Sequence, residues 1–362
     1  MFKGRIFSLT ILGGCSLVLA ACASQPKTLA LSDYGSYRCG QLDIRVAPAE
    51  DGQLLGLEYL DRRVLLKPSP TDTGALYVAP GDTSTRFLAE GKRATLTLKG
   101  DLLPECLEPG AIESRFEAIG ADPDWSALIE NNRMTLTPPY QQQALNEIWL
   151  TETLANRHGR TFEAKTEAQS LEVRVAHQLC EVGLDKRQYP SQIRLTLDGN
   201  SFEGCGGDRE RLFRGVQWVV EDLAGAGLID RSMVTLQFLG NGRVAGRASC
   251  NRFMGNYRLS DDGLSFSTLG STMMACAPSL MNQERKYLEL LGQVVDGRIG
   301  RQGELLLETG NGEVIKALPA TTETPSRSRS VSVSSRSSRP GTAGRSTTTA
   351  TTSRASTTSI EN

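Results

Sequence analysis

Short runs of alternating apolar and polar residues recur along most of the chain and predict an antiparallel β protein. In the N-terminal third these runs are Leu55–Leu60, Val64–Lys67 and Ala94–Leu98, with turn sequences at Asp51-Gly52 and Lys99–Asp101. Successive side chains of a strand point to opposite faces, so each run can bury one face and leave the other in water. The pattern predicts a small antiparallel barrel or sandwich.

The middle of the chain repeats this alternation. The runs there are Met134–Thr137, Leu171–Val175 and Ile193–Leu197, and an Asp198-Gly199 turn follows the last of them. We therefore expect a second module that is entirely β.

The last third of the chain combines strands with a helix. Trp218 opens a predicted strand, and Thr235–Phe238 alternates toward an Asn241-Gly242 turn. Apolar residues at helical spacing predict a helix over 279–291, with Ser279 as its N-cap. The fold class predicted for the whole chain is mainly β with a minor α contribution.

The length and the changes in composition suggest several domains. A chain of 362 residues is expected to hold two or three. We place an N-terminal segment at 1–21, a linker at 22–33, and modules at 34–108, 124–214 and 215–318. The stretch from 108 to 124 is expected to be a loop that lets the modules move. Residues 320–362 are rich in Ser, Thr and Arg and poor in apolar residues, which predicts a disordered basic tail.

The charge balance and the scarcity of histidine narrow the possible functions. Forty Lys and Arg against 41 Asp and Glu give a net charge of -1, so a nucleic-acid partner is not expected. The two histidines, His158 and His177, are too few for most metal sites or catalytic triads. We expect no cofactor, no metal and no catalytic residues. The rival hypothesis of an enzyme acting on the cell wall rests only on scattered carboxylates.

The N-terminus has the features of a targeting segment. Lys3 and Arg5 precede an uncharged apolar run over 6–21. The sequence Leu19-Ala20-Ala21-Cys22 resembles the lipobox of bacterial lipoproteins, which implies lipidation of Cys22. An ordinary cleaved signal peptide or a short helix is the alternative. Since Ala23 is not Asp, the resemblance implies the outer membrane, with the chain lipid-anchored and facing the periplasm or the cell surface.

Six cysteines remain once Cys15 and Cys22 are set aside, and their even number fits an oxidising compartment. They allow 15 disulfide connectivities. Because they fall along the chain in three groups of two, sequential pairing is the simplest; metal ligation, the rival, lacks a CxxC motif. The six are Cys39, Cys106, Cys180, Cys205, Cys250 and Cys276.

The first module resembles the membrane-bound and periplasmic inhibitors of c-type lysozyme. The resemblance rests on Tyr37-Arg38-Cys39, Thr73–Tyr77, Ala94–Leu96 and Cys106. It implies an eight-stranded antiparallel barrel with one disulfide. In that family a serine of an S-G-x-x-Y motif and a lysine of a K-G-D motif enter the lysozyme cleft.

The lysozyme-binding positions are only partly kept in this chain. The motif serine corresponds to Thr73, followed by Gly74 and Tyr77, and the motif lysine corresponds to Glu90. A carboxylate would repel the acidic residues of lysozyme. Lys92, which strand alternation would place on the same face as Glu90, is the candidate replacement for the cation. Lysozyme binding and a barrel with another ligand or none both remain open.

The second module resembles an uncharacterised family of bacterial envelope proteins. The match rests on Cys180, Tyr189-Pro190, Leu197–Gly199 and Gly204–Gly207. It implies a domain boundary and a disulfide but no activity.

The third module strongly resembles the META domain of HslJ-type heat-shock envelope proteins. Gly246–Tyr257, Thr272–Cys276, Met281 and Glu284 carry the resemblance. It implies a curved antiparallel sheet packed on a helix or two, and an association with envelope stress and novobiocin tolerance.

The META motif residues Cys250, Asn251, Gly255 and Cys276 suggest a disulfide that ties a C-N-x-x-x-G turn to the end of a strand. Asn251 is expected to take turn or left-handed geometry, and Gly255 to permit a close approach of backbone. A ligand groove and a stapled turn with a buried asparagine are the two interpretations.

Together these features favour an outer-membrane lipoprotein with a non-catalytic role in envelope protection or stress, which would bind c-type lysozyme or peptidoglycan. The alternative is an envelope assembly or stress-tolerance factor that acts through the META domain without binding lysozyme.

Overall fold

The computed structural model describes residues 35–49, 52–141, 143–165 and 169–320. The predicted signal segment, Cys22, the linker and the Arg-rich tail from residue 321 lie outside the described residues. Within them the chain is mainly β with one α-helix, as the alternating pattern predicts.

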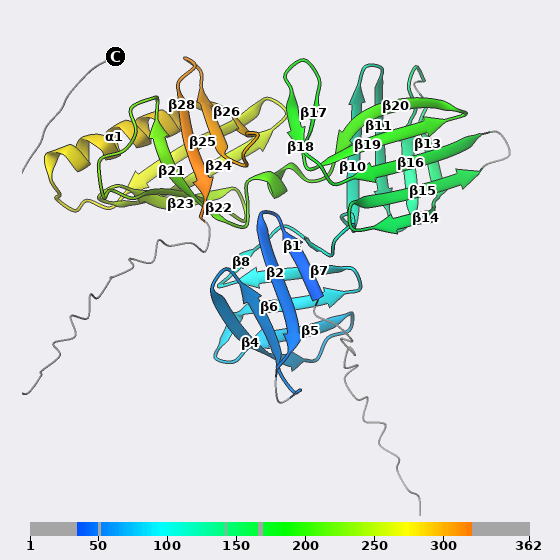
Figure 1. Cartoon of the computed structure of the whole chain (residues 1–362), viewed down its shortest axis with the longest axis horizontal. Coiled ribbons are helices and arrows are strands. Elements are labelled where there is room, and N and C mark those ends of the chain that lie inside the picture. The colour runs from blue at the N-terminus through cyan, green and yellow to red at the C-terminus, as the bar shows by residue number, and fades with distance from the viewer. Residues whose placement is uncertain (1–34, 50–51, 142, 166–168, 321–362) are drawn as a thin grey trace, which may run out of the picture. The chain divides into compact units, whose positions relative to one another are not determined.

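The first module is a closed antiparallel barrel (Figure 1). Its strands follow the order β6-β5-β4-β3-β2-β1-β9-β7-β8, and an additional β6–β7 pairing closes the sheet. Cys39 and Cys106 face each other in the β1–β9 register and form a disulfide. The strands are β1 Gly35–Cys39, β2 Leu42–Pro48, β3 Leu55–Tyr59, β4 Arg62–Ser69, β5 Ala75–Ala79, β6 Asp82–Glu90, β7 Arg93–Leu98, β8 Asp101–Leu102 and β9 Cys106–Leu107.

The second module is a curved sheet with the order β13-β12-β11-β10-β20-β19-β16-β15-β14, beside a small hairpin of β17 and β18. The Cys180–Cys205 disulfide joins the hairpin to β20. Its strands are β10 Arg115–Ala121, β11 Asp124–Glu130, β12 Arg133–Thr137, β13 Leu145–Trp149, β14 Thr151–Asn156, β15 Gly159–Lys165, β16 Ser170–Ala176, β17 Cys180–Val182, β18 Arg187–Tyr189, β19 Ser191–Leu197 and β20 Asn200–Gly206.

Strand β10 lies in the stretch that we expected to be a loop, so that expectation was wrong. The strand does alternate, but its inward positions include the small residues Ala118 and Gly120. A Cβ on Gly120 would lie 2.0 Å from Nε1 of Trp125, so the indole occupies the space that a larger side chain would need. Trp125 of the neighbouring strand β11 therefore fills the space beside Gly120, while β10 itself buries the large side chain of Phe116.

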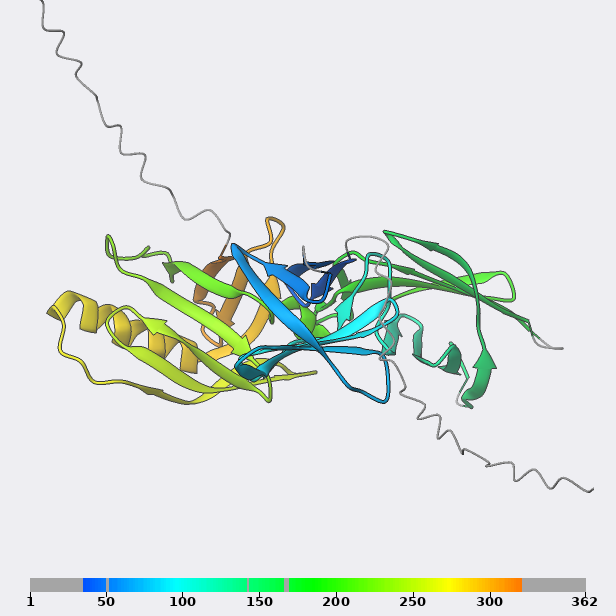
Figure 2. The same cartoon turned by 90° about the horizontal axis from the view of Figure 1, so that it is seen from below.

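The third module curls an antiparallel sheet of order β25-β24-β23-β22-β21-β28-β27-β26 around helix α1 (Figure 2). Helix α1 contacts β23, β25 and β27. The edge strands β25 and β26 also approach each other. The elements are the 3-10 helix η1 Arg209–Leu212, β21 Gln217–Leu223, β22 Val234–Leu239, β23 Arg243–Ala248, β24 Arg252–Ser260, β25 Gly263–Ser271, α1 Pro278–Gly292, β26 Val294–Ile299, β27 Leu305–Thr309 and β28 Val314–Pro319.

The helix begins one residue earlier than predicted. Ala277 is its N-cap and makes no side-chain capping bond, and Pro278 occupies the first turn, so Ser279 is not the cap. Proline suits this position because its fixed φ is already helical and its missing N–H would have had no partner. Tyr287, Leu290 and Leu291 are buried against the sheet.

Arginines of the segment before β21 hydrogen-bond to all three modules. Arg209 donates to the carbonyl oxygens of Ser260, at 2.8 Å, and Gln188, at 3.3 Å. Arg214 donates to the carbonyl of Leu102 in the first barrel. The modules are thus joined by charged side chains that use backbone carbonyls as acceptors.

Candidate functional site

Two turns of the first barrel bring three of the predicted binding residues together. Thr73 and Gly74 precede β5, and Glu90 ends β6, where Ala75 pairs with Ala89. A Cβ on Gly74 would lie 2.4 Å from the carbonyl oxygen of Ala89, and the φ of Gly74 is +62°. Only glycine combines that backbone geometry with so close a contact. Thr73, Gly74 and Glu90 therefore lie at one end of the barrel.

Tyr77 and Lys92 lie elsewhere than expected. Tyr77 is buried in the barrel core opposite Phe87, and this burial raises the pKa of its hydroxyl. Lys92 lies in the turn between β6 and β7, so strand alternation does not apply to it. Its Nζ is 3.8 Å from a carboxylate oxygen of Glu152 on β14. The replacement cation is thus paired with the second module.

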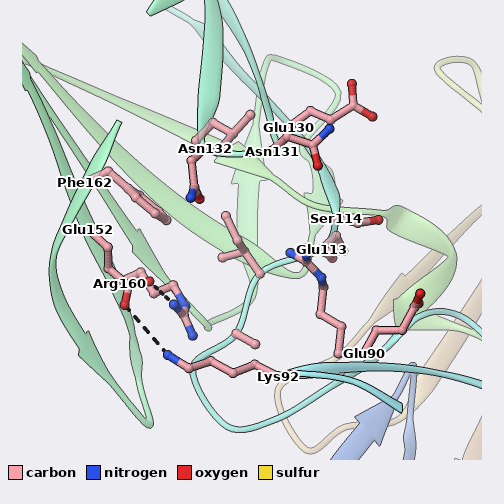
Figure 3. A pocket seen from close by; sticks show the side chains of 14 residues that line it. Glu90, Lys92, Glu113, Ser114, Glu130, Asn131, Asn132, Glu152, Arg160 and Phe162 are labelled. Carbon is pink, nitrogen blue, oxygen red and sulfur yellow. Dashed lines mark hydrogen bonds and ion pairs between the residues drawn. The ribbon is translucent and has the colours of Figure 1, made fainter. Parts of the chain in front are cut away.

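This pairing lies in a cleft of about 450 Å³ between the β6–β7 turn and the second module (Figure 3). The cleft is mixed in character, with acidic, basic, amide and apolar side chains. The residues that line it are Glu90, Lys92, Arg93, Ala111, Ile112, Glu113, Ser114, Ile129, Glu130, Asn131, Asn132, Glu152, Arg160 and Phe162.

The charges of the cleft largely neutralise one another. Lys92 and Arg160 both pair with Glu152 (Figure 3). The Glu113 side chain is only 6% exposed, and its Oε1 lies 3.3 Å from Nε of Arg211. Burial raises the pKa of Glu113, although Arg211 acts in the opposite direction. Among the described residues, no group hydrogen-bonds to Glu113 Oε2.

Sequence patterns did not single out Glu113 or Arg160. Glu113 falls in the stretch that we took for a loop, and Arg160 sits on a strand among other charged residues. Glu113 and Arg160 matter because of their contacts with Arg211 and Glu152, which lie far away or on another strand. A pattern in the neighbouring sequence could not have identified them.

The META motif forms a buried hydrogen-bond network centred on Asn251, which is 4% exposed. Its backbone N–H and side-chain amide donate to the Glu284 carboxylate at 2.9 and 3.1 Å. Its Oδ1 accepts from the Thr272 hydroxyl and the Met274 N–H, both at 2.8 Å. The Cys250–Cys276 disulfide closes the same corner. Because the amide is fully used inside the protein, this geometry favours the stapled turn over a ligand groove.

Asn251 lies in the bend between β23 and β24, which agrees with the expected turn, and the residue with positive φ there is Ser249, at 90°. One detail of the motif differs from expectation. Gly255 lies within β24 and not in a turn. A Cβ there would be 2.8 Å from Leu269 Cδ2 and 2.9 Å from the Ser267 carbonyl oxygen, so the expected close approach of backbone is present.

Neither histidine of the second module is among the residues that line the cleft. Nδ1 of His177 is 3.3 Å from the hydroxyl of Ser191, and burial lowers the pKa of this histidine. His158 is exposed. Across the described residues, no cluster of three or more His, Cys, Asp or Glu side chains could hold a metal ion. Nor does any helix in that part of the chain have the length and apolar character needed to cross a membrane.

These features define a chain of disulfide-stapled β modules whose last member is an α+β unit. Residues 211–322 match the META domain family, and this part of the chain is a META domain. No curated protein matches the chain.

Two solved structures resemble part of the chain. An NMR structure of a protein from Burkholderia xenovorans is 27% identical over 31% of this chain and 86% of the other, with a TM-score of 0.27. A second NMR structure is 24% identical over 31% of this chain and 96% of the other, with the same TM-score of 0.27.

Proposed function

We propose that this chain is a non-catalytic lipoprotein of the bacterial outer membrane that protects the envelope under stress. The observation that carries the proposal is that each module holds one disulfide, Cys39–Cys106, Cys180–Cys205 or Cys250–Cys276. Disulfides persist in oxidising compartments outside the cytoplasm. The lipobox-like sequence ending at Cys22 and the META domain support the same location and role.

A deletion strain tests this proposal. Deletion of the gene should lower survival under cell-wall-directed antibiotics and lysozyme. Expression of the wild-type chain should restore survival, and the restored chain should be found in the outer-membrane fraction. A Cys22→Ala chain should fail to restore survival at equal abundance, because it lacks the lipid anchor. Unchanged survival after deletion, or restoration by an unanchored chain, would contradict the proposal.

Inhibition of c-type lysozyme is a second candidate function, favoured by the adjacency of the Thr73-Gly74 turn and Glu90. Two observations argue against it. Glu90 carries the opposite charge to the lysine at the corresponding position of the lysozyme inhibitors, and Lys92 is paired with Glu152. We infer that the wild-type chain inhibits weakly and that Glu152→Gln, which releases Lys92, inhibits more strongly.

A lysozyme titration on bacterial cell walls distinguishes these cases. The soluble chain from residue 22, with Cys22→Ser, is compared with Glu90→Lys and Glu152→Gln variants. Glu117→Gln, which changes an exposed carboxylate of β10, is the matched control. If no variant slows lysis at high excess, lysozyme is not a ligand of this barrel and the second candidate fails.

A further inference from the structure

A shallow groove on the second module lies next to the cleft and is formed by β11, β12 and β13. Its volume is about 410 Å³, within the about 300–1,000 Å³ typical of small-ligand sites. Glu130 and Asn131 line both hollows, so groove and cleft are contiguous. The residues that line the groove are Leu128, Glu130, Asn131, Arg133, Thr135, Glu147 and Trp149.

Trp149 is an exposed aromatic residue held in a defined position. Trp149 is 64% exposed, whereas Trp125 and Trp218 are 4% and 1% exposed. The guanidinium carbon of Arg133 lies 4.4 Å from the centre of the Trp149 ring, and Arg133 is itself paired with Glu147. A cation over an aromatic ring restrains the ring by electrostatic attraction. A ligand that stacks on this indole would therefore have little side-chain entropy to overcome.

The charges of the groove are already matched. Arg133 pairs with Glu147, and Glu130 lies 3.9 Å from Arg115 on the neighbouring strand β10. An ionic ligand would have to break these pairs and would find no uncompensated charge in return. A neutral ligand with many hydroxyl groups can instead donate to the carboxylates and exchange hydrogen bonds with the Asn131 amide and the Thr135 hydroxyl.

We propose that this groove binds a neutral oligosaccharide, with one pyranose ring stacked on the face of the Trp149 indole opposite to Arg133. The C–H bonds on the face of a sugar ring are weakly positive and pack on the negative face of an indole. The Asn131-Asn132 turn, with φ of 52° and 60°, brings an amide to the rim where groove and cleft meet. The next sugar rings of the oligosaccharide would then lie along the groove past Asn131 and extend toward Glu152 in the cleft. This binding activity goes beyond the proposed role in envelope protection and does not depend on it.

Tryptophan fluorescence can test the proposal, because the buried Trp125 and Trp218 are shielded from a surface ligand. The soluble chain with Cys22→Ser is titrated with short oligomers of N-acetylglucosamine and, separately, of glucose. Binding of either oligomer should change the emission of Trp149, and calorimetry should give the same affinity. Whichever of the two oligomers binds with the higher affinity shows whether the natural glycan is built from N-acetylglucosamine or from glucose.

Two variants make the test decisive. Trp149→Ala should weaken binding by about tenfold or more and remove the fluorescence change, as expected for an aromatic anchor. Tyr140→Ala removes another exposed aromatic side chain of the same module, 86% exposed and outside the groove, and should bind as the wild type does. The proposal is overturned if neither oligomer gives a heat or fluorescence change, or if Trp149→Ala binds as tightly as the wild type.

Discussion

Glu113 and Arg211 form a buried ion pair between the start of the second module and the segment that leads into the META domain. The two atoms Glu113 Oε1 and Arg211 Nε are 3.3 Å apart, and the side chains are 6% and 7% exposed. Arg211 also donates to the carbonyl oxygens of Arg38 and Glu105 in the first barrel. One guanidinium thus satisfies two carbonyl acceptors of the first barrel while it neutralises a buried carboxylate of the second module.

Replacing Arg211 with Ala should lower the free energy of unfolding by about 3–5 kcal/mol. The substitution would leave the Glu113 carboxylate buried without its counter-charge and two carbonyl groups without donors. Urea unfolding of the soluble chain measures the effect. Arg174→Ala, which removes the exposed Arg174–Glu172 pair, should cost at most about 1 kcal/mol. Equal losses for the two variants would refute a special role of the buried pair.

The raised pKa of Glu113 predicts a pH dependence of stability. The Glu113 carboxyl group binds its proton more tightly in the folded chain than in the unfolded chain, where a glutamate has a pKa of about 4.3. Between that value and the raised folded pKa, this group therefore makes the folded state less stable as the pH rises. Glu113→Gln should remove this contribution. The difference in thermal midpoint, variant minus wild type, should grow from acidic to neutral pH, and a difference independent of pH would contradict the assignment.

The sheets and the disulfides could be predicted because their signals are local or evenly spaced. The alternation correctly marks Leu55, Leu57, Leu236 and Phe238 as buried positions of β3 and β22, although Leu60 lies outside β3 and is 50% exposed. The three disulfides follow the sequential pairing, since each links residues of one module.

Contacts between distant segments could not be predicted in this way. Lys92 meets Glu152, and Glu113 meets Arg211, only because separate modules pack together. Tyr77 belongs to a family-like motif, yet β5 buries it in the core. The groove at Trp149 depends on the pairing of β12 with β13, in which Arg133 stands opposite Trp149.

The Asn251–Glu284 contact predicts strong coupling between the META turn and helix α1. Asn251→Ala should cost about 1–3 kcal/mol, because the Met274 N–H and the Glu284 carboxylate lose buried partners. Asn251→Asp should cost more, since it places a second carboxylate against Glu284. Adding Glu284→Gln to Asn251→Asp should recover part of that loss. A double-mutant cycle by urea unfolding measures the coupling, and additive effects would show that the contact is not energetically significant.

Gly74 and Gly91 allow a matched test of the turn that carries the predicted binding residues. Both have positive φ, 62° and 69°, so alanine at either position pays about 1–2 kcal/mol for left-handed backbone. A Cβ at Gly91 meets no described atom within 4 Å, whereas at Gly74 it would lie 2.4 Å from the Ala89 carbonyl oxygen. Gly74→Ala should therefore be less stable than Gly91→Ala by about a further 1–3 kcal/mol. Urea unfolding of the two variants supplies the comparison; equal stability would mean that the Thr73-Gly74 turn does not pack against the end of β6.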